Sequence, residues 1–433
     1  MDPCEPGWAS QPDPVASTSP DDARARLVAE LRRRGGRFSR TVQEAFARVP
    51  RHIFVPEVSA AAAYRDEALV IKCGPDGLPI SSSSQPAMMA IMLEQLALRP
   101  GHRVLEIGTG SGYNAAVMAE VVGPGGLVVS IDIDPELVAR ARASLMAAGY
   151  DDVTVLCADG GYGDPADAPF DRIIVTAGAW DIAPAWLDQL GPDGRLVLPL
   201  SLHGIQLSVA LELAGDDWVS RSAWRCGFVR MLGAFAGPER VFRLDEPQPL
   251  FAQMSDGSPV DGPALQRALA AQPANVPISP GLAGLADIAD LDLWLTITSA
   301  DVARLTVLAA PGDWLPLAPG LPFGGLIAHA TDPGRIGIVM LLPIATSPIG
   351  TPRNGQGGRA SLGLGFSGFG PGGAAIAARL AERTMEWEER GRPGAHELEL
   401  TVRAVRPRRG APATGLARVF RRPSVTIEAG WPG

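Results

Sequence analysis

The sequence is poor in the residues on which several classes of protein depend. Cysteine occurs only at Cys4, Cys73, Cys157 and Cys226 in 433 residues, and no two of these are at metal-ligand spacing. We therefore expect free thiols in a reducing cytoplasm rather than a disulfide framework. The five histidines are scattered through the chain, so we expect no metal site.

Long apolar runs and an excess of basic charge are also missing. No run approaches the roughly 18 apolar residues of a membrane span. The acidic, proline-rich N-terminus has no apolar segment typical of an export signal. A net charge of −9 is the opposite of the basic footprint of nucleic-acid binders. These absences predict a cytoplasmic protein that binds neither nucleic acid nor membrane.

From about residue 101 onward, short apolar strands alternate regularly with helical runs. Two short helices, near residues 22–35 and 41–49, precede this region. The expected strands are 102–108, 127–133, 153–159, 170–178 and 194–200, with helices at 113–122 and 135–149. Such alternation is typical of βαβ units, so it predicts an α/β fold with a parallel, doubly wound sheet.

The composition changes near residue 238, where a proline-containing linker begins. We expect an α+β extension with strands at 291–298, 334–343 and 396–405 and a helix at 374–390. The glycine-rich stretch 350–373 lacks a Lys followed by Ser or Thr, so a mobile loop is expected there rather than a phosphate site. The predicted division is a disordered segment 1–21, a core domain 22–237 and a C-terminal domain 238–433.

The most specific local motif is "RVLEIGTGSGYNAA", a strand, a glycine-rich turn and a helix start. Gly108, Gly110 and Gly112 allow the backbone to turn tightly and to approach a ligand. Glu106 precedes them on the strand. A tight corner between strand and helix is the alternative explanation.

Acidic residues end the next two strands as well. Asp132 lies about 20 residues beyond Gly112, where a ribose diol needs a carboxylate, and Asp159 ends the third strand. With no cation to meet a phosphate, the crevice suits S-adenosylmethionine, a cationic nucleoside, better than a dinucleotide. Asp134 is expected instead to start a helix. The predicted cofactor-binding residues are Glu106, Gly108, Thr109, Gly110, Ser111, Gly112, Asp132, Ile133, Asp159 and Gly160.

A run of four serines, residues 81–84, comes immediately before a helix that starts at Pro86. Ser83, Ser84 or Gln85 is expected at its N-cap. The run is either a polar rim that holds a carboxylate at a helix start or a flexible connector in which one hydroxyl functions.

Several segments in order resemble the protein-L-isoaspartate O-methyltransferase family. They are "AFARVPRHIFVP", "AYRDEALVI", "SQPAMMAIMLEQL", "RVLEIGTGSGY", "PFDRIIVTAGA" and "LDQLGPDGRLVLPL". The resemblance covers about residues 40–237 and implies a Rossmann-like methyltransferase core that uses S-adenosylmethionine.

The resemblance also implies roles for individual residues. The family's serine beside the carboxylate to be methylated matches Ser84 best, with Ser81 second, and we include Ser83 because the run makes the alignment ambiguous. Gln85 is a further candidate substrate contact. Tyr64 and Asp66 would order a loop over the active site, or simply pack in that loop.

Two departures from the family bear on the substrate. The substrate-contacting stretch resembles "GFVRMLG", which contains Phe228, Val229 and Arg230, and Arg230 stands where the family usually has proline. That cation would either pair with a substrate carboxylate or lie exposed on an edge strand. The residues after the core form a tail that the family's repair enzymes lack, whereas longer relatives resemble methyltransferases of ribosomally made peptides.

We therefore predict methylation of an Asp side chain in a ribosomally made precursor peptide, giving an ester that cyclises to aspartimide or yields isoaspartate. General repair of isoaspartyl proteins and a non-catalytic scaffold that binds S-adenosylmethionine or peptide are the alternatives. The tail would recognise peptide or support a homodimer.

Overall fold

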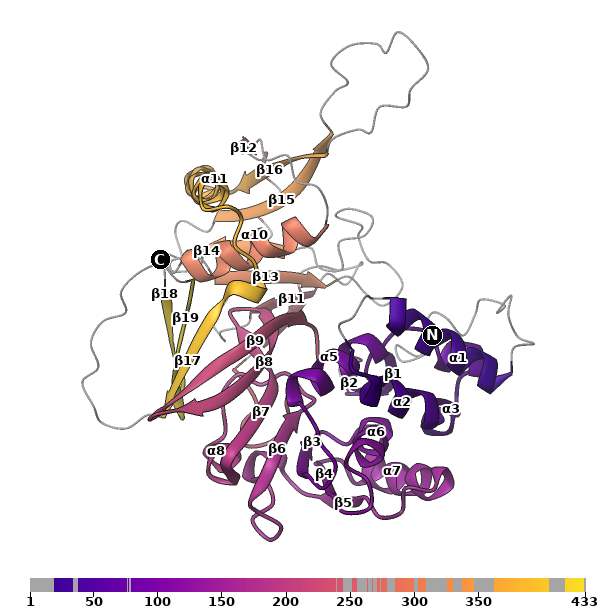
Figure 1. Cartoon of the computed structure of the whole chain (residues 1–433). Coiled ribbons are helices and arrows are strands. Elements are labelled where there is room, and N and C mark those ends of the chain that lie inside the picture. The colour runs from indigo at the N-terminus through magenta and orange to yellow at the C-terminus, as the bar shows by residue number, and fades with distance from the viewer. Residues whose placement is uncertain are drawn as a thin grey trace.

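The computed structural model contains one large mixed sheet and one smaller antiparallel sheet (Figure 1). It describes residues 19–33, 38–75, 77, 79–238, 240–243, 251–254, 263, 267, 271–272, 274–278, 285–299, 303–308, 325–329, 337–345, 362–404 and 417–431. The expected disordered segment 1–21 lies outside these residues up to position 18, and the first helix begins at Pro20.

Short helices and a hairpin precede the large sheet. The helices are α1 (Pro20–Arg33), α2 (Arg40–Arg48), α3 (Arg51–Phe54) and α4 (Ala60–Ala63). The antiparallel hairpin consists of β1 (Leu69–Cys73) and β2 (Pro79–Ser83), followed by α5 (Pro86–Leu96). These helices bury the apolar stripe of their sequences against α6 (Tyr113–Val122), where Phe46 and Phe54 pack on Tyr113.

The predicted parallel sheet is confirmed. Its strands are β3 (Arg103–Ile107), β4 (Leu127–Asp132), β5 (Thr154–Cys157), β6 (Phe170–Val175) and β7 (Leu190–Leu202). They pair in the order β5-β4-β3-β6-β7, and every pairing among them is parallel. Alongside α6, the connections include α7 (Pro135–Ala148), η1 (Gly160–Tyr162) and α8 (Pro184–Asp188). The carboxyl ends of β3, β4 and β6 therefore meet at one edge.

The large sheet continues with antiparallel strands, of which the sequence analysis predicted only the one near 396–405. They are β8 (Ile205–Ala214) and β9 (Asp217–Cys226) from the core and β17 (Glu399–Ala404), β18 (Ala417–Arg421) and β19 (Val425–Gly430) from the tail. Strand β17 pairs with β9, so the last strands of the tail belong to the same ten-stranded sheet as the parallel strands of the core.

The rest of the tail builds the smaller sheet. It orders β10 (Arg240–Arg243), β11 (Phe251–Met254), β13 (Ala303–Leu308), β14 (Gly325–His329), β15 (Gly337–Ala345), β16 (Leu362–Phe369) and β12 (Ala274–Ile278). Helices α10 (Leu285–Thr298) and α11 (Gly373–Glu389) and the 3-10 turn η2 (Ala395–Glu397) complete it. The strands predicted near 334–343 and 396–405 and the helix predicted at 374–390 are confirmed.

Two predictions for the tail were wrong. Residues 291–298 form the end of helix α10, not a strand. Their apolar residues alternate in the sequence, but α10 is buried on several sides, and such a helix carries no clear 3.6-residue stripe. Residues 362–369 of the expected mobile loop are strand β16, whereas 350–361 lie outside the described residues.

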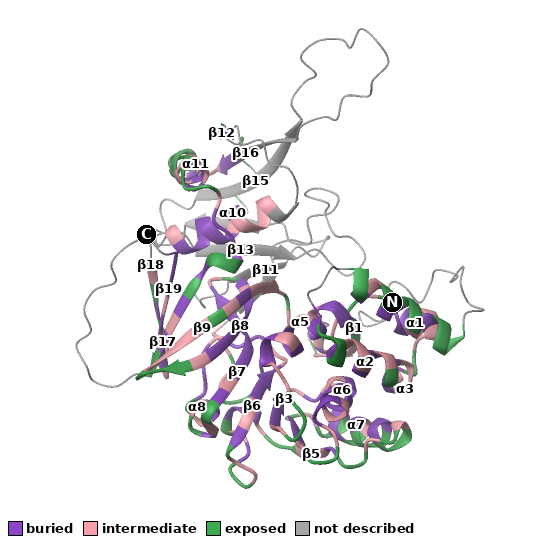
Figure 2. Cartoon of the chain, in the orientation of Figure 1, coloured by how far each residue is buried: buried purple, intermediate pink, exposed green. Residues whose placement is uncertain are grey.

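One apolar core joins α10, α11 and the large sheet. The indole of Trp294 contacts that of Trp431, with ring centroids 5.0 Å apart, and Trp387 is fully buried beside them. Buried residues run without a break from the strands of the large sheet into α10 (Figure 2). Burial on this scale fixes the tail's position relative to the core.

The cysteine prediction needs one correction. Cys157 and Cys226 are free, as expected, but Cys73 is disulfide-bonded. Among the described residues, no helix is long and apolar enough to span a membrane, and no cluster of three potential metal ligands occurs.

Candidate active site

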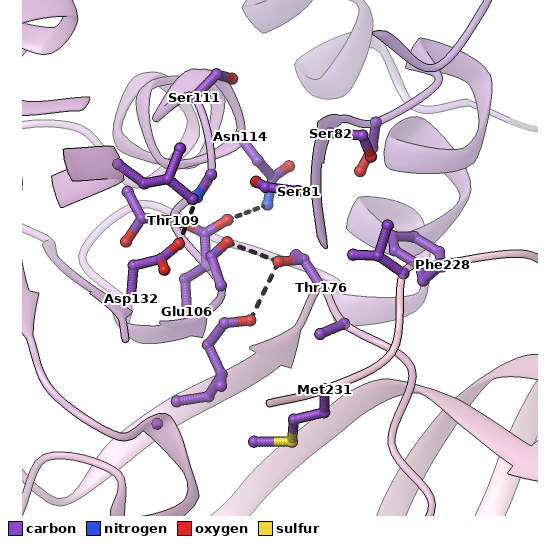
Figure 3. A pocket seen from close by; sticks show the side chains of 18 of the residues that line it. Ser81, Ser82, Glu106, Thr109, Ser111, Asn114, Asp132, Thr176, Phe228 and Met231 are labelled. Atoms are coloured by element: carbon purple, nitrogen blue, oxygen red, sulfur yellow. Dashed lines mark hydrogen bonds between the residues drawn. The ribbon is translucent and has the colours of Figure 1, made fainter. Parts of the chain in front are cut away.

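A pocket is lined by residues at the carboxyl ends of β3, β4 and β6 and by residues of β2. Figure 3 shows side chains that line it. We call one side the glycine end and define it by Glu106, Gly108–Ser111, Asn114 and Asp132–Asp134. We call the other side the serine end and define it by Ser81–Ser84 and Phe228–Leu232. Both groups line the same pocket, together with Thr176.

Glu106 occupies the floor of the glycine end, and its side chain is fully buried. Its carboxylate accepts hydrogen bonds from Ser130 Oγ at 2.6 Å and from Asn114 Nδ2 at 2.7 Å. Burial raises the pKa of Glu106 to about 7, although the two hydrogen bonds favour the ionised form. A nearby cation would stabilise the ionised form of this carboxylate.

The glycine-rich turn brings the backbone against its neighbours. Gly108 has φ +100°, and a Cβ there would lie 2.5 Å from Thr176 Oγ1. Thr176 in turn donates its hydroxyl to the Gly108 carbonyl at 2.7 Å. Only glycine meets both the positive φ and the close approach, so this turn packs tightly against Thr176, and its contact with a ligand stays a prediction.

Asp132 ends β4 and folds back over this turn. Its carboxylate accepts from the Gly110 and Asp134 backbone N–H groups at 2.9 and 3.0 Å. Burial raises the pKa of Asp132 above its ordinary value. Asp134 caps α7, as expected, through hydrogen bonds from Glu136 N and Leu137 N. It also pairs with Lys72 on β1, at 2.6 Å.

The structure places most predicted cofactor residues at the glycine end but not all of them. Gly160 lines the pocket, whereas Gly112 and Asp159 are not among the lining residues. The Asp159 carboxylate accepts from Gly161 N at 2.9 Å and from Ala234 N at 2.7 Å. It therefore anchors the segment after Leu232, and its contact with a cofactor stays a prediction.

At the serine end, the four serines belong to a strand and its exit rather than to a loose connector. Ser81 and Ser83 are buried, and Ser82 and Ser84 are partly exposed. The N-cap of α5 is Gln85, with Pro86 at the first position, but no side chain of that residue caps the helix. Of the expected N-cap residues, Gln85 is confirmed, and neither Ser83 nor Ser84 holds that position.

The start of α5 is instead capped from the loop that precedes β1. Asp66 Oδ1 accepts from Ala87 N at 2.8 Å, and its other oxygen accepts from Gln85 Nε2 at 3.2 Å. A carboxylate thus already occupies the positive end of this helix. Asp66 and Gln85 order the loop beside the serines, while Tyr64 is buried and bonds to His52 at 3.0 Å. None of these three lines the pocket.

Arg51 stabilises the serine end through hydrogen bonds to its backbone, and its side chain is fully buried. Its guanidinium donates to the carbonyls of Ser83 and Ser84 at 3.3 and 3.0 Å and to those of Arg65 and Glu67 at 3.1 and 3.2 Å. One cation thereby joins the loop before β1 to the end of β2. Sequence analysis missed this residue, although it lies in "VPRHIF", one of the segments that carry the resemblance.

The stretch 228–232 forms the opposite wall. Gln206 bonds to both the N–H and the carbonyl of Phe228, and Gly178 N donates to the Val229 carbonyl at 2.7 Å. Phe228, Val229 and Arg230 line the pocket, as predicted, and Met231 and Leu232 join them. Arg230 is partly buried and forms a bridge with Gly178 rather than lying on an exposed strand.

Known proteins with a similar sequence match this part of the chain. The family model described as protein-L-isoaspartate(D-aspartate) O-methyltransferase matches residues 22–234. Protein-L-isoaspartate O-methyltransferase 2 of Archaeoglobus fulgidus is 45% identical over 212 residues, which are 49% of this chain and 92% of that protein. The Methanopyrus kandleri enzyme of the same description is also 45% identical, over 50% of this chain and 95% of its own length.

The chain belongs to the protein-L-isoaspartate(D-aspartate) O-methyltransferase family. It is an enzyme of the S-adenosylmethionine-dependent class. Among solved structures, one described as protein-L-isoaspartate O-methyltransferase covers 87% of this chain and 96% of its own, with 22% identity and a TM-score of 0.48. The two relatives named above match the core, which is about half of this chain.

The glycine end of this methyltransferase fits S-adenosylmethionine by its chemistry. Glu106 and Asp132 supply carboxylates for a cationic nucleoside, and the glycines leave room for it beside the backbone. Among the described residues, Asn114 Oδ1 is buried without a hydrogen-bond partner, so it is available to an ammonium donor. The individual contacts stay predictions.

Sequence analysis missed several lining residues, including Asn114, Thr176, Met231 and Leu232. Asn114 is the second residue of α6, two positions after Gly112, and it lies within the quoted motif, so the sequence could have indicated it. Thr176 directly follows β6, and the rule that ligands bind at the carboxyl ends of parallel strands would have indicated it.

Proposed function

We propose that this enzyme transfers a methyl group from S-adenosylmethionine to the free carboxylate of an isoaspartyl residue in a peptide or protein. The observation that carries the proposal is that the carboxylate-rich glycine end and the hydroxyl-rich serine end line one continuous pocket. The relatives' descriptions name the isoaspartyl substrate class.

The chain's own residues have a simple task in this reaction. A carboxylate is ionised near neutral pH, so no general base is required. A serine hydroxyl donates to the oxygen that does not react, and such a bond to a charged group contributes about 1.5–3 kcal/mol. Bound S-adenosylmethionine supplies the electrophilic methyl group. Phe228 and Met231 exclude water from the space between the two ends. Alignment of the carboxylate oxygen with the methyl group then accounts for most of the rate enhancement.

The test is a mass-spectrometric methylation assay on an isoaspartyl hexapeptide and its ordinary aspartyl twin. Methyl gain on the isoaspartyl peptide alone is the expected result. Ser84→Ala should lower kcat/KM by about 10–100-fold through loss of a charge-assisted hydrogen bond. Ser83→Ala is the matched control, since the Ser83 hydroxyl is buried beside Arg51 at 3.5 Å, and it should change kcat/KM less. No methyl gain on either peptide would refute the proposal.

A second candidate is methylation of one Asp side chain in a ribosomally made precursor peptide, followed by closure to an aspartimide. Arg230 favours it, because a cation in the pocket wall adds a contact for an acidic peptide. The tail favours it too, since its strands extend the core sheet. The same assay with a precursor peptide separates the two functions. Methyl gain on one Asp, followed by loss of methanol, would support the second, and a precursor left unchanged would exclude it.

A further inference from the structure

A second cavity adjoins the serine end of the pocket. Its lining consists of Gly178, Trp180, Arg230, Met231, Leu232, Ala236 and Gly237. Arg230, Met231 and Leu232 line the main pocket as well, so one stretch of chain separates the two spaces. A peptide whose reactive carboxylate lies at the serine end must place its neighbouring residues close to this stretch.

Apolar groups form most of the wall of this cavity. Trp180, Met231, Leu232 and Ala236 contribute hydrocarbon or aromatic surface. Gly237 lets the chain pass close to the tryptophan, because a Cβ at that position would lie 2.7 Å from Trp180 Cβ. Arg230 is the charged residue of this lining, and it borders the main pocket as well. The apolar remainder of the lining suits a side chain without charge, since burial of a charge there would cost its hydration.

The tail supplies the support for the Trp180 wall. The guanidinium carbon of Arg422 lies 4.2 Å from the Trp180 ring centroid, and its Nη2 donates to the Ser201 carbonyl at 3.1 Å. Two residues later, Ser424 N donates to Asp181 Oδ2 at 2.9 Å, and Asp181 is only 4% exposed. The turn between β18 and β19 therefore holds residues 180–181 in place.

We propose that this cavity is a subsite for an apolar side chain next to the methylated residue of the substrate peptide, and that the tail shapes it through Arg422. The inference rests on the proposed function, because it takes the main pocket as the place where the carboxylate reacts. Arg422 is a positioning residue: it acts on the peptide through Trp180. The tail thus sets which peptides the core accepts.

The test measures binding of isoaspartyl hexapeptides to the full chain by calorimetry with saturating S-adenosylhomocysteine. The peptides carry Leu or Gly immediately before or after the isoaspartate. The variants are Trp180→Ala, Arg422→Ala and Arg422→Lys. Arg421→Ala is the matched control, because Arg421 is the exposed last residue of β18, immediately before Arg422. Thermal melts confirm that each variant is folded, and Arg422→Ala keeps the test valid if Trp180→Ala fails to fold.

Wild type should bind the Leu peptide about tenfold more tightly than the Gly peptide at one of the two positions. Trp180→Ala should abolish this preference, and Arg422→Ala should reduce it to about threefold or less. Arg422→Lys should fall between Arg422→Ala and wild type, because an ammonium lacks the flat stacking surface of a guanidinium. Arg421→Ala should leave the preference unchanged.

The same samples are assayed for methyl gain, which separates the two proposals. Equal affinity for Leu and Gly peptides in wild type, or a preference that survives both Trp180→Ala and Arg422→Ala, would overturn the subsite while leaving methylation intact. Preferential binding without methyl gain on any isoaspartyl peptide would overturn the proposed function and leave the subsite standing. Binding of no peptide at all would overturn both.

Discussion

The glycine end and the serine end of the pocket draw on different parts of the chain. Every hydrogen bond described above for Glu106 and Asp132 joins residues that lie between 106 and 134, within one strand–helix–strand unit. The serine end depends on partners far away in sequence. Arg51 holds Ser84, Gly178 holds Val229, and Arg422 of the tail stacks on Trp180.

This difference has a physical consequence for specificity. The glycine end takes the hydrogen bonds of Glu106 and Asp132 from one local unit, and Thr176 and Lys72 add two contacts from farther away in the chain. A short motif therefore supplies most of this end. At the serine end, each wall is held by a separate long-range contact, and one wall can change while the other stays. An added tail can therefore alter the accepted peptide without disturbing the cofactor.

Removal of Arg51 should have the largest effect on stability, because it removes the long-range hydrogen bonds that hold the serine end. Arg51→Met leaves the buried carbonyl of Ser83 and the partly buried carbonyls of Ser84, Arg65 and Glu67 without their donor. Since each unsatisfied buried group costs about 1–3 kcal/mol, we expect the free energy of unfolding to fall by about 3–5 kcal/mol. Urea denaturation measures it. Arg99→Met, at an exposed position, is the control, and equal loss in both variants would contradict the role of Arg51.

Gly108→Ala tests the glycine end of the pocket. Its Cβ would lie 2.5 Å from Thr176 Oγ1 at a φ of +100°, so strain and displacement of Thr176 should cost about 2–4 kcal/mol. We expect affinity for S-adenosylhomocysteine, measured by calorimetry, to fall by about 30-fold or more. Gly125→Ala has open space around its Cβ and should bind normally. Normal binding by Gly108→Ala would show that the turn adapts.

The same difference explains what could be predicted from the sequence. The parallel strands, helices α6 and α7 and most glycine-end residues follow from short-range patterns. The serines were identified as a rim, but the cap of α5 was not, because Asp66 comes from a separate loop. Nothing in a linear pattern indicates that Asp66 returns to Ala87.

The tail was predictable only where its elements are exposed on one side. Helix α11 has such a stripe and was found, whereas α10 is buried on several sides and its Leu291, Leu293 and Leu295 mimic strand alternation. The pairing of β17 with β9 joins residues about 180 positions apart, and edge-strand pairing over that distance has no local signal.

Glu106 should make the stability of the cofactor-free enzyme depend on pH. Burial raises its pKa in the folded state to about 7 from an ordinary value of 4.5, so between these values the folded state binds more protons than the unfolded state. Stability should therefore fall by about 2–3 kcal/mol as pH rises from 4.5 through 7. Urea denaturation across this range measures it. Glu106→Gln should show a flatter profile, and identical slopes would mean that Glu106 does not titrate there.

The smallest effect is expected where the hairpin β1–β2 meets the glycine end. Lys72, the chain's single lysine, pairs with Asp134 across this junction, and both side chains are partly exposed. Because water and salt weaken such pairs, Lys72→Ala should reduce affinity for S-adenosylhomocysteine by only about two- to fivefold at low salt, and by nothing measurable near 1 M salt. Calorimetry at the two salt concentrations measures this, with Arg48→Ala, which removes the surface pair with Glu120, as the control. A loss of affinity that persists at high salt would mean that Lys72 shapes the pocket by packing rather than by charge. The glycine end would then depend on the β1–β2 hairpin for its shape.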